Sequence, residues 1–161
     1  HVLTFAVEHE IEEFTQRGAI AFGSDPNQDL RTNSTGFIGE YRLTLADQLS
    51  LSASIRRDNN SDFQNATTYR ATAAYLFDDY GLRIHGSYGT GVKNPTFTER
   101  FGFFASSLFS PFIGNPNLKP EKSRGWELGI EKDWLDNRVK LGVTYFDEKL
   151  KNEIKIKIKK K

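Results

Sequence analysis

One short segment concentrates residue types that recognise bulky ligands. Arginine pairs with anions, and aromatic rings bury a large area at a small entropic cost. An apolar segment on an exposed loop either packs among neighbouring loops or forms a recognition surface, and both interpretations stay open here. The candidate ligand-binding residues are Arg100, Phe101, Phe103, Phe104, Phe109 and Phe112.

A second segment offers oxygen atoms that could bind a cation. Asp58, Asn60 and Asp62 alternate like the opening of a calcium loop. Phe63, however, occupies the position of the sharp-turn glycine of an EF-hand, and Tyr69 that of its bidentate glutamate. An EF-hand is therefore excluded, and an irregular calcium site is weighed against a solvated loop. No firm metal site is expected.

Other chemistry finds little support. The absence of cysteine excludes disulfides, thiolate metal sites and cysteine nucleophiles. The three histidines are far apart in sequence, and no cluster of serine, histidine and acid is evident, so we expect neither an enzyme nor a bound cofactor. The formal net charge of +1 is spread along the chain and gives no basic field for nucleic acid.

The elements that carry these residues are predicted to be strands. Apolar and polar residues alternate in seven segments, which is the period of a strand with two different faces. The segments lie near residues 3–12, 37–45, 49–56, 68–77, 82–88, 126–131 and 138–145. The predicted apolar, lipid-facing set is Leu51, Ile55, Tyr75, Ile84, Leu128, Leu141 and Val143, and the predicted lumen-facing set is Arg56, Arg70, Arg83, Glu127 and Lys140.

The connections between these segments alternate in length. Long or medium connections at about 15–33, 59–65 and 91–122 alternate with short ones at 46–48, 78–80 and 133–137. A meander in a transmembrane barrel has this pattern, with tight turns at one end and long loops at the other. We therefore expect an all-β antiparallel meander, a partial segment of a large transmembrane β-barrel. A soluble antiparallel sheet with one face on a core is the alternative.

Three motifs add a resemblance to a known family. They are SYGTGVKNPT at 87–96, GNPNLKPEKS at 114–123 and WEL at 126–128. Together they resemble TonB-dependent outer-membrane receptors of the siderophore or vitamin B12 type. The resemblance places these motifs at the rim of the barrel, where strands leave the membrane. The motif residues assigned to the rim are Asn94, Pro95, Gly114, Asn115, Pro116, Pro120 and Glu121. Pro95 can end the hydrogen-bond ladder of a strand, and Asn115 to Asn117 are residue types typical of a turn. These motif residues therefore either build the barrel rim alone or also contact a ligand.

The resemblance implies that this chain is a fragment. Such receptors have about 22 strands, and seven cannot close a barrel of that size. Residues 1–152 are expected to be barrel wall, and 153–161 a low-complexity Lys/Ile tail. The implied partners are the outer-membrane bilayer of a Gram-negative bacterium, the rest of the barrel, the plug domain, TonB, and a ferric siderophore or cobalamin, with no nucleic acid. The alternatives are a passive porin or structural barrel and a soluble β-rich binding module.

Overall fold

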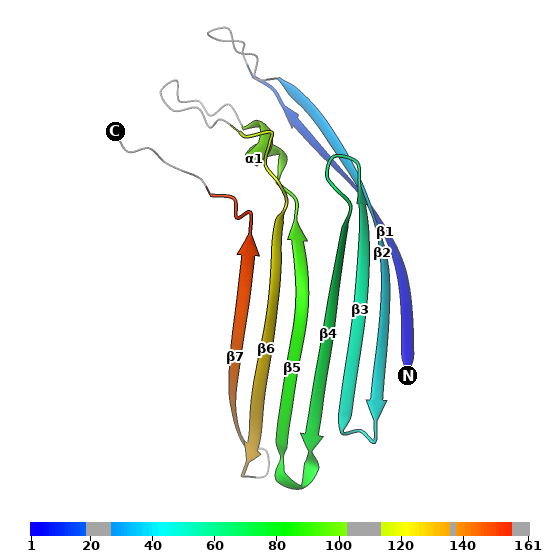
Figure 1. Cartoon of the computed structure of the whole chain (residues 1–161), viewed down its shortest axis with the longest axis vertical. Coiled ribbons are helices and arrows are strands. Elements are labelled where there is room, and N and C mark those ends of the chain that lie inside the picture. The colour runs from blue at the N-terminus through cyan, green and yellow to red at the C-terminus, as the bar shows by residue number, and fades with distance from the viewer. Residues whose placement is uncertain (19–26, 103–113, 136–137, 156–161) are drawn as a thin grey trace, which may run out of the picture.

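Seven strands form one antiparallel sheet in the computed structural model, which describes residues 1–18, 27–102, 114–135 and 138–155. The strands are β1 (Val2–Gln16), β2 (Gln28–Leu45), β3 (Leu49–Asn60), β4 (Ala66–Phe77), β5 (Leu82–Lys93), β6 (Glu121–Trp134) and β7 (Val139–Lys151). The 3-10 turn η1 (Asp78–Tyr80) and the helix α1 (Phe97–Phe101) complete the described elements. Each strand pairs with the next in sequence (Figure 1), which confirms the predicted meander.

The register separates apolar from polar side chains, because directly opposite residues share a face of a sheet. One row across the sheet is apolar and contains Leu49, Tyr75, Ile84, Ile130 and Val143. A row on the opposite face is polar and contains Ser52, Thr72, Ser87 and Glu127. The two sets of residues predicted to face apart lie on these two faces, so their separation is confirmed.

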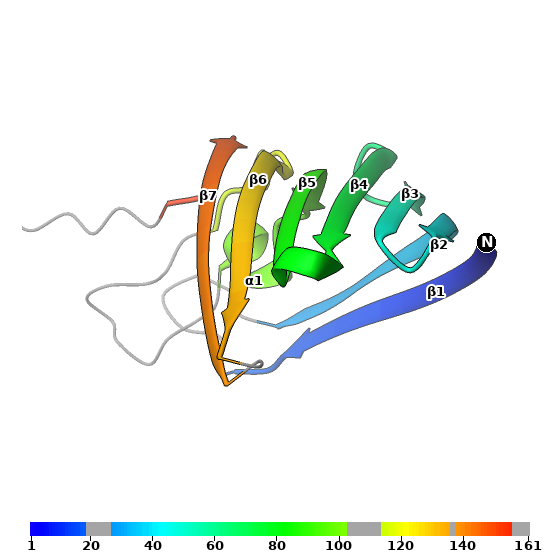
Figure 2. The same ribbon diagram turned by 90° about the horizontal axis from the view of Figure 1, so that it is seen from below.

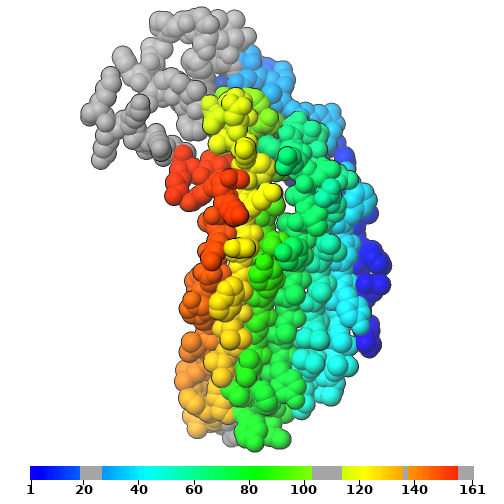
Figure 3. Space-filling model, in the orientation of Figure 1, coloured from blue at the N-terminus to red at the C-terminus, as the bar shows by residue number. Residues whose placement is uncertain are grey.

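The sheet is curved like part of a cylinder wall, and α1 lies within the curve (Figure 2). Residues of the helix line the same cavity as polar-face residues such as Asn60, so the polar face is concave and the apolar face is convex. Along the wall the strands form one continuous surface (Figure 3). Val143 on the convex face is 72% exposed, and the described residues provide no cover for it. The described part of the chain has no helix that is long and apolar enough to cross a membrane.

The tight turns join the strands at one end of the sheet. Ala46 and Asp47 have positive φ angles of 51° and 57°, which match the right-handed twist of a two-stranded hairpin. Gly81 follows η1 with a φ of 52°. The short connections predicted at 46–48 and 78–80 are therefore present. The seventh strand was expected to end near residue 145, but pairing with β6 continues to Lys151.

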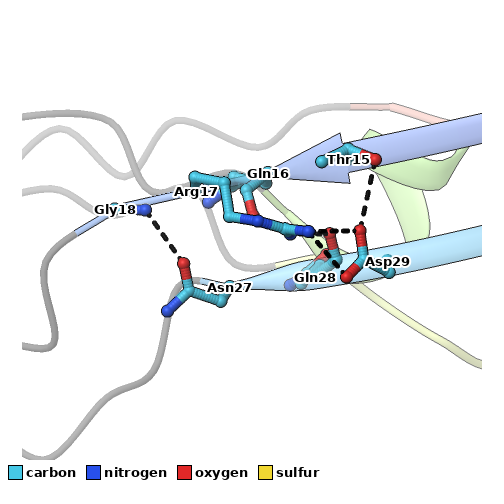
Figure 4. Close-up of polar contacts among 7 residues, drawn as sticks. All are labelled: Thr15, Gln16, Arg17, Gly18, Asn27, Gln28 and Asp29. Atoms are coloured by element: carbon cyan, nitrogen blue, oxygen red, sulfur yellow. Dashed lines mark hydrogen bonds and ion pairs between the residues drawn. The ribbon is translucent and has the colours of Figure 1, made fainter.

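The predicted loop at 15–33 is wrong in its bounds, because β1 and β2 remain paired up to Gln16 and Gln28. Arg17 holds this end together (Figure 4): it donates to the carbonyl oxygens of Gln16 and Gln28, at 2.9 and 3.1 Å, and to both carboxylate oxygens of Asp29, at 2.7 and 2.8 Å. Thr15 donates to the same carboxylate at 3.2 Å. Leu30 is the only apolar residue among 28–33, so the alternation of apolar and polar residues gave no signal for this part of β2.

The Arg17–Asp29 pair leads to a first prediction. The hairpin end lies beyond the apolar part of the convex face, and the hydrogen bonds from Arg17 lower the pKa of Asp29. A lowered pKa means that the pair is present at neutral pH and is lost as pH falls through that lowered value. At neutral pH, Asp29→Asn should therefore speed amide hydrogen exchange at residues 15–18 and 27–30. Glu12→Gln on the same hairpin is the control, and equal exchange in both variants would contradict the clamp.

Candidate ligand-facing rim

A one-turn helix on the concave face organises the rim. Thr96 accepts a hydrogen bond from the Glu99 backbone N–H at 3.2 Å, and the Glu99 carboxylate accepts one from the Thr96 N–H at 2.8 Å. This reciprocal pair is a capping box, which satisfies two N–H groups at a helix start. This helix was not predicted from the sequence, although Thr96-x-x-Glu99 is the signature of a capping box.

The helix is anchored by an aromatic contact with β1, near the end of that strand. Phe97 is 6% exposed and is the only large hydrophobic side chain that is buried among the described residues. Its ring centroid lies 5.9 Å from that of Phe14 on β1. A cavity of about 100 Å³ beside it is lined mainly by polar residues of the concave face, including Glu10, Glu12 and Asn60. The rim thus combines one apolar anchor with a polar recess.

Arg100 is held by the β3–β4 connection. Its guanidinium carbon lies 4.8 Å from the ring centroids of both Phe63 and Phe101. A nitrogen of the same group lies 3.9 Å from an Asp62 carboxylate oxygen, and the side chain is 17% exposed. The structure therefore brings two predicted ligand candidates, Arg100 and Phe101, together with Asp62. The other candidates, Phe103, Phe104, Phe109 and Phe112, lie outside the described residues.

The oxygen atoms considered for calcium have other partners. Asp58 pairs with Arg56 at 2.8 Å, and Asn60 accepts a hydrogen bond from Asn94 at 3.2 Å. Within the described ranges, no group of three or more His, Cys, Asp or Glu side chains is arranged to hold a metal. In this structure Asp58 stabilises the wall, while Asn60 and Asp62 join β3 and its loop to the segment around α1.

The GNP motif closes the base of the long connection. A β-carbon at Gly114 would overlap the backbone of Arg100, Phe101 and Gly102, so only glycine fits there. The next residue, Asn115, donates its backbone N–H to the carbonyl oxygen of Glu99 at 2.9 Å. We call this closure, formed by Glu99–Gly102 and Gly114–Asn115, the neck. Gly102 and Gly114, the described residues on either side of 103–113, therefore lie side by side.

The remaining motif residues secure the strands below the neck. Pro95 is buried and follows the last residue of β5, Lys93, by two positions. Lys93 lies 3.7 Å from a Glu99 oxygen and 3.4 Å from a Glu121 oxygen, so it links α1 to the start of β6. Pro116 follows Asn115 in a turn closed by the Leu118 N–H at 3.2 Å, and the Pro120 carbonyl accepts a hydrogen bond from Asn152 at 3.3 Å. These contacts are architectural.

A curved antiparallel wall with one apolar and one polar face, tight turns at one end and a folded rim at the other defines the class: a segment of a transmembrane β-barrel. Residues 8–156 match the TonB dependent receptor-like β-barrel family, and the chain belongs to that family. The family and the structural neighbours are receptors, in agreement with the expectation that the chain is not an enzyme.

Two solved structures show the same fold. The siderophore receptor PirA from Pseudomonas aeruginosa is 23% identical, with a TM-score of 0.73 over 91% of this chain and 27% of that receptor. The siderophore receptor PirA from Acinetobacter baumannii is 19% identical, with a TM-score of 0.73 over 94% of this chain and 24% of that receptor. This chain therefore spans about a quarter of the receptors that it matches.

Proposed function

We propose that this chain is part of the wall and extracellular rim of an outer-membrane receptor that imports a ferric siderophore in a TonB-dependent manner. The barrel family and the siderophore receptors that share the fold support this proposal. The single observation that carries it is the folded rim. The neck fixes the base of the long connection on the concave side, where a ligand would enter the lumen.

The chemistry of the rim favours an anionic, bulky ligand. Arg100 places a guanidinium group, with 17% of its side chain exposed, at the rim beside Asp62 and two aromatic rings. A ligand carboxylate or catecholate could accept a hydrogen bond from such a group. Cobalamin, which carries a phosphate, is the second candidate ligand. The plug domain and TonB are proposed partners because the family couples a plug to TonB.

Uptake by the intact receptor tests this proposal. A Gram-negative host that lacks its own siderophore receptors would express the complete protein and receive radioactive iron bound to catecholate or hydroxamate siderophores, or labelled cyanocobalamin. We expect uptake of at least one ferric siderophore, and loss of that uptake when tonB is deleted. Uptake of cyanocobalamin alone would assign the second ligand. Uptake that persists without TonB would instead support a passive porin.

The long connection provides a sharper prediction for binding. Replacing residues 103–113 by a short Gly-Ser linker should leave barrel insertion unchanged, because Gly102 and Gly114 already lie together. Siderophore binding should weaken by about tenfold or more, since aromatic anchors often contribute about 2 kcal/mol each. The shift in gel mobility between heated and unheated samples measures barrel folding and insertion. Equilibrium binding of the ferric siderophore measures affinity.

A Gly-Ser segment of the original length is the control for this replacement. It keeps the length of the segment and removes its apolar side chains, which are mainly phenylalanines, so it should weaken binding to a similar extent. Unchanged affinity in both correctly inserted variants would show that the aromatic residues serve loop packing alone.

A further inference from the structure

The convex face becomes strongly basic at the rim end of β6 and β7. Lys122 lies directly opposite Lys151, and Arg124 lies directly opposite Lys149, so all four side chains share the convex face. We call these four residues the basic patch. Trp126 is the next convex-face residue of β6 after Arg124, on the side toward the tight turns. The patch therefore borders the apolar surface directly.

No acid among the described residues forms an ion pair with the basic patch. All four side chains are exposed, and none forms an ion pair with a residue that the structure describes. The nearest acid on the same face is Asp147, which lines a hollow of about 170 Å³ with Arg124 and Lys149. Like charges that face each other across two strands repel. Among the described residues, Asp147 is thus the one carboxylate that shares this hollow with Arg124 and Lys149, which leaves the patch with a net positive charge.

The surroundings of the patch match a phosphate group that is joined to an apolar body. A groove of about 280 Å³ places the hydroxyls of Thr67, Tyr69 and Thr90 beside the four cations. Directly below, the rings of Tyr69 and Tyr88 stack with centroids 6.0 Å apart, and those of Trp126 and Tyr145 lie 5.3 Å apart. Aromatic side chains at this position are typical of the boundary between bilayer and water.

We propose that the basic patch binds the phosphate groups of a phosphorylated glycolipid in the outer leaflet, of the lipid A type, whose acyl chains lie along the convex face. Arg124 lies two residues along β6 from Trp126, a distance of about 7 Å, so a lipid beside Trp126 would carry its headgroup within reach of the patch. A free phosphate ion would not need the apolar surface that continues below through Leu128 and Tyr145. This inference rests on the outer-membrane location proposed above.

Lipid binding to the complete purified receptor in detergent tests the inference. The probes are bisphosphorylated lipid A, fully dephosphorylated lipid A and phosphatidylglycerol. In the test variant, Arg124→Gln and Lys149→Gln remove one opposed pair of the patch. We expect affinity for bisphosphorylated lipid A to fall by about tenfold or more, since each cation near a lipid surface contributes substantially to anion binding. Binding of dephosphorylated lipid A should not change.

A matched control removes the same charge from the concave face. Arg70→Gln and Lys140→Gln alter two cations on the polar side of β4 and β7, and this variant should bind bisphosphorylated lipid A like the parent. Equal loss in both variants, or equal binding of the two forms of lipid A by the parent, would overturn the inference. So would equal affinity for phosphatidylglycerol. A receptor that imports its siderophore and shows one of these results would refute the lipid site alone.

Discussion

Leu128→Arg in the intact receptor should lower the free energy of unfolding in lipid vesicles by about 2–4 kcal/mol, because it places a charge in the hydrocarbon layer. Leu128 lies on the convex face, opposite Gly86 on one side and Tyr145 on the other. None of these neighbours offers a carboxylate to the new arginine. Denaturant unfolding in vesicles, followed by tryptophan fluorescence, measures the change.

The matched control for this variant places arginine on the concave face one strand away. Ser87 already donates a hydrogen bond to Glu127 at 2.9 Å, so the guanidinium of Ser87→Arg would meet both a carboxylate and water. We expect a change well below that of Leu128→Arg. Equal destabilisation by the two substitutions would show that the convex face is not in contact with lipid.

Gly114→Ala should disrupt the neck and have the second largest effect. The new β-carbon would overlap the backbone of Arg100 and Phe101, and backbone cannot move aside as a side chain can. Overpacking of this kind costs about 1–3 kcal/mol locally, so the hydrogen bond between the Asn115 N–H and the Glu99 carbonyl should be lost. Hydrogen exchange at residues 97–102 should speed up, and siderophore affinity should fall by about tenfold.

Gly142→Ala is the control for Gly114→Ala. A β-carbon at Gly142 would come no closer than 3.4 Å to Glu131, near ordinary contact distance, so the wall should accept it. Normal hydrogen exchange at α1 in Gly114→Ala would contradict the tight neck. Faster hydrogen exchange with unchanged siderophore affinity would show that the neck is present but does not contribute to ligand binding.

The meander could be predicted from sequence because each strand has one apolar face and one polar face. Leu128 beside Glu127, and Ile84 beside Arg83, fix the face of each side chain and so exclude a register shift of one residue. The signal ends where both faces meet water. Residues 28–33 are polar except for Leu30, and one apolar residue shows no period, so their strand was mistaken for a loop, although Arg17 and Asp29 keep it paired.

The rim could be predicted only in part. The sequence singled out Arg100, but not the contact with Asp62 and Phe63, because these residues lie about 40 positions apart in the chain and meet only after the strands have paired. The helix α1 has five residues, which is too short to show a helical period, so its capping box is the sequence feature that indicates it. Asn60 and Asp62 suggested a cation site for the same reason: their protein partners lie in a distant segment.

The neck also bears on how such receptors diversify. Because Gly102 and Gly114 lie side by side, the segment between them can change length or be exchanged between relatives without altering strand register. A foreign peptide inserted between these glycines should therefore be displayed at the cell surface on an undisturbed barrel.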